Sequence, residues 1–496
     1  MKTLRFSSSR LPRASAAALI FACTGACAEG STPQPGTISS GGAAGSMGGS
    51  AGDDSSSVAG SSGMAGQGAG GEAPINIPWQ WAGIVGTGQS LAVGDNGSAR
   101  GSADATVRAT TQPFGNMKLS TGSAVWPVDP DDRSLTLVPL IEPIGRPAPN
   151  YPSSWPTNIA GETPHAAMAN QITALVQDAG GADYVSVHSE VGENGQCLSF
   201  LVKGALPMGA MDVRAHAYEA TLIETRAITR LAQEAGKTYG VGAIIVTHGE
   251  CDNGTVGYAA QLHQLWSDYK ADLSAITGQT QPPLLIVSQQ NSQGDRSVST
   301  LEQRRVGVDY PADAVCSGPK YQYPYGPDGV HLLVAGYEQL GEKYAQVYYE
   351  RVVRGRDWRP LEPTGVQRDG RVLHVRFHVP VPPLAWEETF QAPHQGTLSE
   401  WSQGKGFEVR GGAGNIAISA VELSGDGVDI TCATDLPATG VTVGYALTGD
   451  GASMAAPFAG TKYWGQLRDS DPFVGSTTQT PQPNFAVAFE LPVPNG

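Results

Sequence analysis

A serine follows a glycine-rich turn near the start of the apolar part of the chain. The string Gly86-Thr-Gly-Gln-Ser90-Leu comes directly after the apolar run Trp81–Val85. A turn at the end of a strand would present the Ser90 hydroxyl to a cleft, but a serine hydroxyl is a weak nucleophile until a base takes its proton. Ser90 is therefore a candidate nucleophile that needs a base from elsewhere in the chain.

A base and a group to orient it occur together in the string Asp328-Gly-Val-His331. An imidazole can take the serine proton and return it to a leaving alcohol, while a carboxylate fixes the tautomer and stabilises the imidazolium. A separation of three residues lets one loop carry both side chains. Either string alone is common: Gly48-Gly-Ser50-Ala-Gly52 matches the nucleophile elbow of other hydrolases in a stretch with no strand before it. The order of the strings along the chain makes them informative.

A third string, Thr247-His-Gly-Glu-Cys-Asp252, ends another apolar run. The three strings in this order resemble the SGNH (GDSL-type) hydrolases, in particular the carbohydrate-esterase branch that includes sialate O-acetylesterase-like enzymes, whose first block reads GQS. The resemblance covers roughly residues 80–352. It implies a three-layer α/β/α domain with a flavodoxin-like sheet and ester hydrolysis through an acyl-serine, without metal or cofactor. Ser90, Asp328 and His331 would be the catalytic residues.

The resemblance also implies hydrogen-bond donors for the oxyanion that forms during acyl transfer. The backbone N–H of Ser90 is one of them. A second is expected in Gly192-Glu-Asn-Gly195, where Gly192, Asn194 and Gly195 remain alternatives because the register of the motif is open. His248 occupies the place of a glutamine in the QGESD block of the branch, so a neutral imidazole N–H would have to donate there.

Three polar neighbours of these positions are expected to support the site. Gln89 precedes the nucleophile, while Glu250 and Asp252 would fix His248 or its loop. Solvation and capping of the loop explain the two acidic residues equally well. His188, at the end of another apolar segment, is expected to be a buried structural histidine.

Hydrophobic periodicity supplies the elements that would position these residues. Short apolar segments predict strands within 81–85, 184–187, 242–246 and 283–287. Apolar residues at helical spacing predict helices over 163–179, 213–235, 258–276 and 333–353. The alternation predicts a mostly parallel sheet covered on both faces. Sites in such sheets gather at the carboxyl ends of the strands, which is where Ser90 and His248 lie.

The pattern changes after residue 354. Segments 372–379 and 485–491 alternate apolar and other residues, and glycine-rich turns recur between them. Alternating apolar residues with recurring turns predict a separate antiparallel β-sandwich over 357–496. It would follow a hydrolase domain over 75–354. The β-sandwich would either bind polysaccharide or brace the hydrolase domain, and bracing is slightly favoured because no row of exposed aromatic residues can be identified.

The first 28 residues are typical of an export signal, with basic residues before the short apolar stretch 16–22. Two outcomes stay open: cleavage at Ala26-Cys-Ala28, or a membrane tether through lipidated Cys23 or Cys27. Residues 29–74 are almost wholly Gly, Ser and Ala, which predicts a disordered tether. We expect an exported protein, extracellular or at the outer surface or periplasm of a bacterium. Its oligomeric state stays open.

The chain has 496 residues and a net charge of −15, so it is a poor candidate for binding nucleic acid. Four cysteines lie outside the leader, without the C-x-x-C spacing of a zinc site. In an exported protein they can form disulfides in three connectivities. The pair Cys197 and Cys251 is the first to test, because both follow neighbouring predicted strands; Cys316 and Cys432 are the others.

The predicted function is an exported serine esterase that removes acyl groups, O-acetyl first among them, from an acylated carbohydrate. One alternative is a lipid or aryl esterase on the same scaffold, which predicts an apolar cleft. Another is a surface glycan-binding protein with a decayed esterase site, of which His248 would be the first sign. The intact set of Ser90, Asp328 and His331 argues against decay.

Overall fold

A computed structural model describes residues 75–95, 107–125, 129–145, 161–181, 184–205, 217–412, 414–451 and 461–496. The predicted export signal, Cys23 and Cys27 and the predicted tether lie outside these ranges. The described residues belong to one compact unit. None of the described helices combines the length and the apolar character that a membrane span needs.

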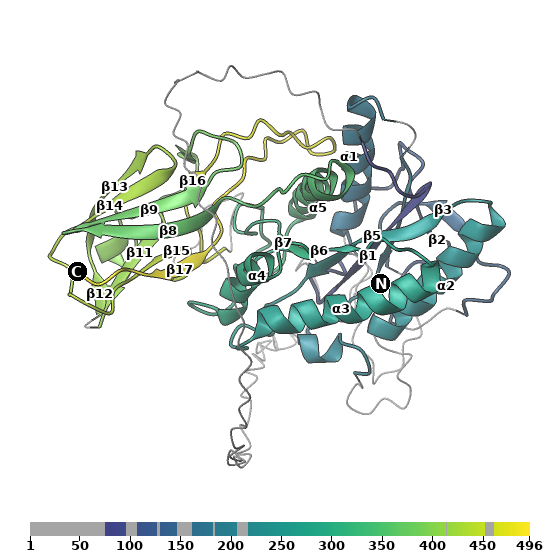
Figure 1. The fold of residues 1–496 in the computed structure, drawn as a ribbon, viewed down its shortest axis with the longest axis horizontal. Helices are drawn as coiled ribbons and strands as arrows, with labels where there is room; N and C mark the ends of the chain where they lie inside the picture. Colours follow the sequence, from purple (N-terminus) through teal and green to yellow (C-terminus); the bar gives the residue numbers. More distant parts are fainter. Residues whose placement is uncertain are drawn as a thin grey trace, which may run out of the picture. The chain divides into compact units, whose positions relative to one another are not determined.

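A seven-stranded sheet forms the centre of the N-terminal region (Figure 1). Its order is β3 (Leu137–Pro139), β2 (Met117–Leu119), β4 (Ser186–Glu190), β1 (Trp81–Gly88), β5 (Tyr239–Thr247), β6 (Leu284–Val287) and β7 (Ala314–Cys316). All neighbours pair in parallel except β2 and β3. The order β4-β1-β5-β6-β7 is that of flavodoxin-like sheets, with β1 at the point where the strand order reverses.

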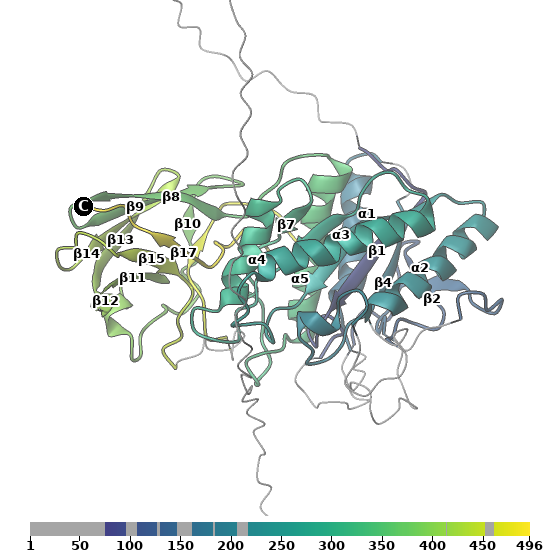
Figure 2. The same cartoon turned by 60° about the horizontal axis from the view of Figure 1, so that its bottom comes forward.

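Helices cover both faces of this sheet (Figures 1 and 2). One face carries α1 (Pro164–Asp178) and α5 (Val334–Tyr348), and the other carries α2 (Ala217–Glu234), α3 (Tyr258–Thr277) and α4 (Val298–Asp309). Every residue of β5 is buried, as expected for a strand between two helical layers. The predicted three-layer α/β/α architecture is confirmed.

Local sequence explains where these helices begin and how closely they pack. The Thr163 hydroxyl caps α1 by accepting the N–H of His165. Helices α1 and α5 approach closely at Gly341, where a Cβ atom would lie 2.1 Å from the Pro164 carbonyl oxygen. Gly278 ends α3 with a φ of 76°, a conformation that glycine adopts readily.

The C-terminal region contains two four-stranded antiparallel sheets, in agreement with the predicted antiparallel β-sandwich. One contains β12 (Gly414–Ile416), β11 (Phe407–Gly411), β15 (Thr442–Tyr445) and β17 (Phe489–Pro492). The other contains β13 (Ile418–Ser424), β14 (Gly427–Cys432), β9 (Val372–His378) and β8 (Glu362–Asp369). Phe377 of β9 contacts Phe407 and Phe489 of the facing sheet, so the two sheets share one core. A short pair, β10 (Ala385–Trp386) and β16 (Leu467–Arg468), lies beside them.

Buried hydrogen bonds join the two regions. Gln289, just after β6, exchanges two bonds with the backbone of Ala488, at 2.8 and 2.9 Å. The Tyr321 hydroxyl donates to the Ala486 carbonyl at 2.6 Å. These contacts involve the segments after β6 and β7, so the C-terminal region holds the carboxyl edge of the sheet in place.

Candidate active site

Ser90 lies on the turn that follows β1, at the carboxyl edge of the sheet. Its Oγ is 2.7 Å from Nε2 of His331, and Nδ1 of His331 is 2.6 Å from Oδ2 of Asp328. The turn requires glycine at position 88, where φ is 151° and a Cβ atom would lie 2.1 Å from the Thr247 carbonyl oxygen. The structure thus brings the three residues from the two distant strings into one hydrogen-bonded line.

The Asp328 carboxylate also builds the loop that carries it. Its Oδ1 accepts the backbone N–H groups of Val330 and His331, both at 3.0 Å. Gly329 between them adopts a φ of 70°, which favours glycine. One side chain therefore folds the turn through one oxygen and orients the imidazole through the other.

Charge around His331 sets its protonation. Burial disfavours the imidazolium, but the hydrogen bond that His331 donates to Asp328 and the negative charges of Asp95 and Asp328 outweigh it and raise the pKa of His331. Oδ2 of Asp95 lies 3.7 Å from Nε2 of His331. Burial opposes ionisation of Asp328 too, yet its bonds to His331 and Val330 lower its pKa to about 2. Asp328 is therefore ionised at neutral pH, and His331 is a stronger base than free imidazole.

The three alternatives for a second oxyanion donor occupy different places. Gly192 is buried, and a Cβ atom there would lie 2.9 Å from both the Gly88 carbonyl oxygen and Val93 Cγ1, so it packs on the turn that carries Ser90. Asn194 is half-buried, and Gly195 is exposed on a turn with a φ of 71°. Of the three alternatives, Gly192 packs on the turn that carries Ser90, and Gly195 lies at the surface.

The structure does not place His248 as an oxyanion donor. Its Nδ1 lies 2.6 Å from the Tyr258 hydroxyl and its Nε2 lies 2.9 Å from the Gln196 carbonyl oxygen. Burial is the main reason that its pKa is lowered, so the ring is neutral and has a single N–H. That N–H donates to Gln196, and the other nitrogen accepts from Tyr258. His248 instead joins the loops after β4 and β5.

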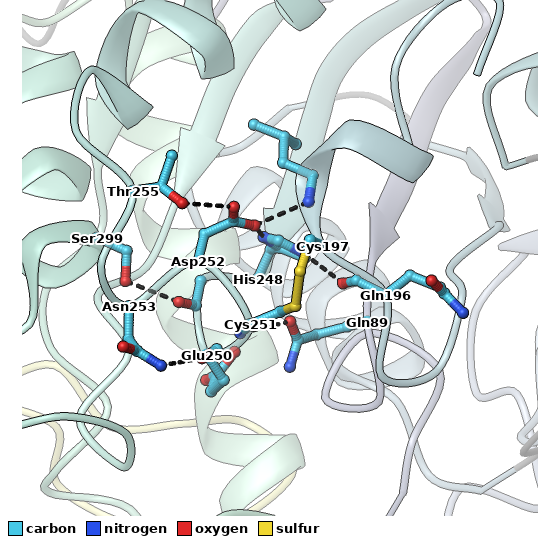
Figure 3. Close-up of a disulfide and its surroundings, with 12 residues drawn as sticks. Gln89, Gln196, Cys197, His248, Glu250, Cys251, Asp252, Asn253, Thr255 and Ser299 are labelled. Carbon is cyan, nitrogen blue, oxygen red and sulfur yellow. Dashed lines mark hydrogen bonds and ion pairs between the residues drawn. A yellow bond between two sulfur atoms is a disulfide. The ribbon is translucent and has the colours of Figure 1, made fainter. Parts of the chain in front are cut away.

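A disulfide between Cys197 and Cys251 connects the same two loops and confirms the pair expected first (Figure 3). The N–H of Cys251 donates to Gln89 Oε1 at 3.3 Å, which ties the residue before the nucleophile to this bridge. Asp252 accepts the Leu198 N–H at 2.8 Å, which fixes the loop after β4. It also accepts the Thr255 hydroxyl at 2.9 Å, which fixes its own loop (Figure 3). The other two cysteines, Cys316 and Cys432, are free and buried.

Replacing Cys197 and Cys251 together with alanine is expected to lower the free energy of unfolding by about 4 kcal/mol. The disulfide spans 54 residues, and without it the unfolded chain gains conformational entropy. Urea unfolding followed by tryptophan fluorescence measures the change. In the control, a reducing agent should destabilise the wild type by a similar amount and leave the double variant unchanged. Identical urea midpoints for the wild type with and without reductant would contradict a stabilising bridge.

Glu250 has a partner that sequence reasoning missed. Its Oε1 lies 2.9 Å from Nζ of Lys320, and both side chains are buried. Burial alone would raise the pKa of Glu250, but the Lys320 charge and hydrogen bond lower it below its usual value. Lys320 belongs to the loop after β7, and its backbone N–H donates to Asn291 Oδ1 at 2.7 Å. Glu250 therefore joins the loop after β5 to the segments after β6 and β7 and does not fix His248.

A chain of buried polar groups lies beside the end of β1. His165 Nε2 is 2.7 Å from Glu190 Oε2, and its Nδ1 is 2.9 Å from Nδ1 of His188, which in turn contacts Ser186. Burial lowers the pKa of His165 to about 3 and raises that of Glu190 well above its usual value. Burial disfavours charge on all three groups, the pKa of His188 being lowered as well. Both ring nitrogens of His188 have hydrogen-bond partners, as expected for a buried structural histidine. Gly86 leaves room for these side chains, because a Cβ atom there would collide with Glu190 and His165.

Within the described ranges, no three His, Cys, Asp or Glu side chains are grouped as a metal site would require.

No protein-family model and no curated protein matches the sequence. Among solved structures, the chain is similar to a carbohydrate acetylesterase from Xanthomonas citri, with 12% identity and a TM-score of 0.46 over 83% of this chain and 80% of the other. A carbohydrate acetylesterase from Sinorhizobium meliloti matches with 13% identity over 54% and 97% of the two chains, at a TM-score of 0.26. An aryl esterase from M. smegmatis matches at 13% identity over 54% and 97%, with a TM-score of 0.25. These similarities are too distant to assign an activity, which has to come from the geometry of the site.

Proposed function

We propose that this protein is a serine esterase that removes acyl groups, O-acetyl first among them, from carbohydrate through an acyl-serine intermediate. The observation that carries the proposal is the unbroken line from Ser90 Oγ through both nitrogens of His331 to Asp328, with distances of 2.7 and 2.6 Å. A hydroxyl, a base and an orienting carboxylate in this arrangement are the parts that acyl transfer requires.

In the first half of the reaction, Ser90 Oγ attacks the acyl carbon while His331 Nε2 takes its proton. The backbone N–H groups of Ser90 and Gly192 stabilise the oxyanion, and one such donor is typically worth about 3 kcal/mol. The imidazolium then gives the proton to the sugar oxygen as the ester bond breaks. Water attacks the acyl-serine in the second half, with His331 again acting as base. Asp328 stays ionised and stabilises the imidazolium in both halves.

A buried polar segment follows β6 and is linked to the proposed base through Lys320 and Glu250. Every residue of the segment 288–292, which follows β6, is polar and buried. Among the described residues, Asn291 Nδ2 and Ser292 Oγ have no hydrogen-bond partner. Asn291 is tied through Lys320 to Glu250, whose charge acts on His331.

A glycan-binding protein with a decayed esterase site is one competing function. Both ring nitrogens of His248 have structural partners, so no side chain donates to the oxyanion from this place and the proposed mechanism relies on backbone donors. The hydrogen-bonded line of Ser90, His331 and Asp328 argues against decay. The lipid or aryl esterase remains the competing activity, because the same three side chains could cleave any accessible ester.

Hydrolysis of three substrates by the full chain tests the proposal: p-nitrophenyl acetate, acetylated xylan and p-nitrophenyl octanoate. We expect acetate release from the first two, and kcat/KM for the octanoate at least about tenfold below that for the acetate, because a polar site gains nothing from a longer alkyl chain. Faster cleavage of the octanoate would identify a lipid esterase. Release from none of the three would refute the esterase proposal.

A further inference from the structure

A cavity of about 540 Å³ lies between the α/β region and the β-sandwich. This volume falls within the range of pockets that hold small ligands. The segment Gln322–Pro324 and residues Gln339 and Lys343 of α5 line one part of it, and residues of the C-terminal region line the rest. Neither Ser90 nor the two residues that act on it line the cavity, so it is separate from the proposed catalytic centre.

Rings form much of the apolar wall. Phe390 and Phe485 stack on each other with centroids 5.1 Å apart and planes within 4°. Tyr323 and Pro324 also line the cavity. Such surfaces suit a ligand that has an apolar face, and the carbon-bound hydrogens of a sugar ring form one.

Neutral polar side chains line the same cavity. Gln322, Gln339, Gln482 and Thr389 are among the lining residues. The Gln482 amide also donates to Glu342, and the Thr389 hydroxyl donates to Glu387. An amide carries both a donor and an acceptor, and so does each hydroxyl of a sugar. A ligand with an apolar face and several hydroxyls therefore matches both kinds of wall.

The charged side chains in the wall already have partners. Lys343 Nζ contacts Gln346, the Gln482 carbonyl and Asn484 at 2.6 to 3.0 Å. Arg468 Nε lies 3.0 Å from Glu387 Oε2. A charged ligand would have to displace these bonds, so the cavity suits an uncharged one.

The cavity shares a segment with the catalytic loop. Tyr323 and Pro324 line the cavity, and the Pro324 carbonyl accepts the Leu333 N–H at 2.9 Å. Asp328 and His331 lie between these two residues in the chain. A ligand in the cavity would thus be held against the segment that carries the proposed base.

We propose that this cavity is a non-catalytic binding site for one or two units of an uncharged sugar chain, formed jointly by the α/β region and the β-sandwich. The site holds a polysaccharide next to the catalytic segment, and its occupation needs no ester cleavage. It goes beyond the proposed hydrolysis, and it can exist whether or not Ser90 is a nucleophile.

Calorimetric titration of the full-length Ser90→Ala variant with xylohexaose, cellohexaose and mannohexaose tests the site. In Ser90→Ala/Gln339→Trp, an indole on α5 fills the cavity. The matched control is Ser90→Ala/Gln261→Trp, which places the same side chain at an exposed position of α3. Ser90→Ala/Thr389→Trp, which changes an exposed residue of the other wall, is a second blocking variant in case Ser90→Ala/Gln339→Trp does not fold. Thermal unfolding measures the folding of each variant without reference to activity.

We expect at least one hexaose to bind, its Kd to rise at least about tenfold in the blocking variant and to stay unchanged in the control. No binding of any of the three hexaoses would overturn the proposal. An unchanged Kd in a folded blocking variant would also overturn it, because the ligand would then bind elsewhere. Since Ser90 is absent throughout, neither result depends on whether the chain is an esterase.

Discussion

Replacing Ser90 with alanine is expected to lower kcat on p-nitrophenyl acetate by about 10⁶-fold, the loss typical of removing the nucleophile of a serine triad. The Oγ atom at 2.7 Å from His331 Nε2 is the only atom changed, and the side chain is 4% exposed, so the fold should persist. Initial rates and covalent labelling with a fluorophosphonate measure the effect. Both the rate and the labelling should fall to background in the variant.

Ser288→Ala is the matched control for this experiment. Ser288 is also buried and hydrogen-bonded, with its Oγ 2.8 Å from the Tyr344 hydroxyl, but it does not contact His331. This variant should keep the rate within about tenfold and label normally. If Ser90→Ala were labelled like the wild type, or if Ser288→Ala lost labelling in its place, Ser90 would not be the nucleophile.

Replacing Asp328 with asparagine is expected to lower kcat/KM by about 10⁴-fold, because an amide cannot hold the imidazole tautomer that accepts the Ser90 proton. The change should also move the pH profile. His331 acts as a base only when neutral, so wild-type kcat/KM should rise with pH through an inflection above 6.5, where the raised pKa of His331 lies. In the variant the carboxylate that raises this pKa is gone, and the inflection should move to lower pH.

Asp429→Asn provides the matched control. In the β-sandwich, Asp429 Oδ1 lies 2.7 Å from Nδ1 of His374, which reproduces the same kind of pair away from Ser90. This substitution should change neither the rate nor the inflection. A pH profile of Asp328→Asn that keeps the wild-type inflection would show that Asp328 does not set the protonation of His331.

Elements with a strong local pattern were predicted closely. The helix expected over 258–276 is α3 (Tyr258–Thr277), and the segment 242–246 lies within β5 (Tyr239–Thr247). Helix α4 was missed because its sequence, VSTLEQRRVGVD, is polar and has no marked apolar face. Strands β2 and β7 were missed because three residues are too few to show a period. Such short strands form because they pair with a neighbouring strand, and such a helix forms because it packs against the rest of the domain.

The sequence by itself predicted the scaffold and selected the candidate residues. The strand and helix periods are local, and the order of the three strings, with the resemblance it carries, was enough to select Ser90, Asp328 and His331. Only the tertiary structure decided the supporting contacts. His248 binds Tyr258 and Gln196, and Lys320 neutralises Glu250, because loops far apart in the chain meet at this edge. A hydrogen bond or ion pair depends on atoms within about 3 Å, and no period or spacing in the sequence encodes that proximity.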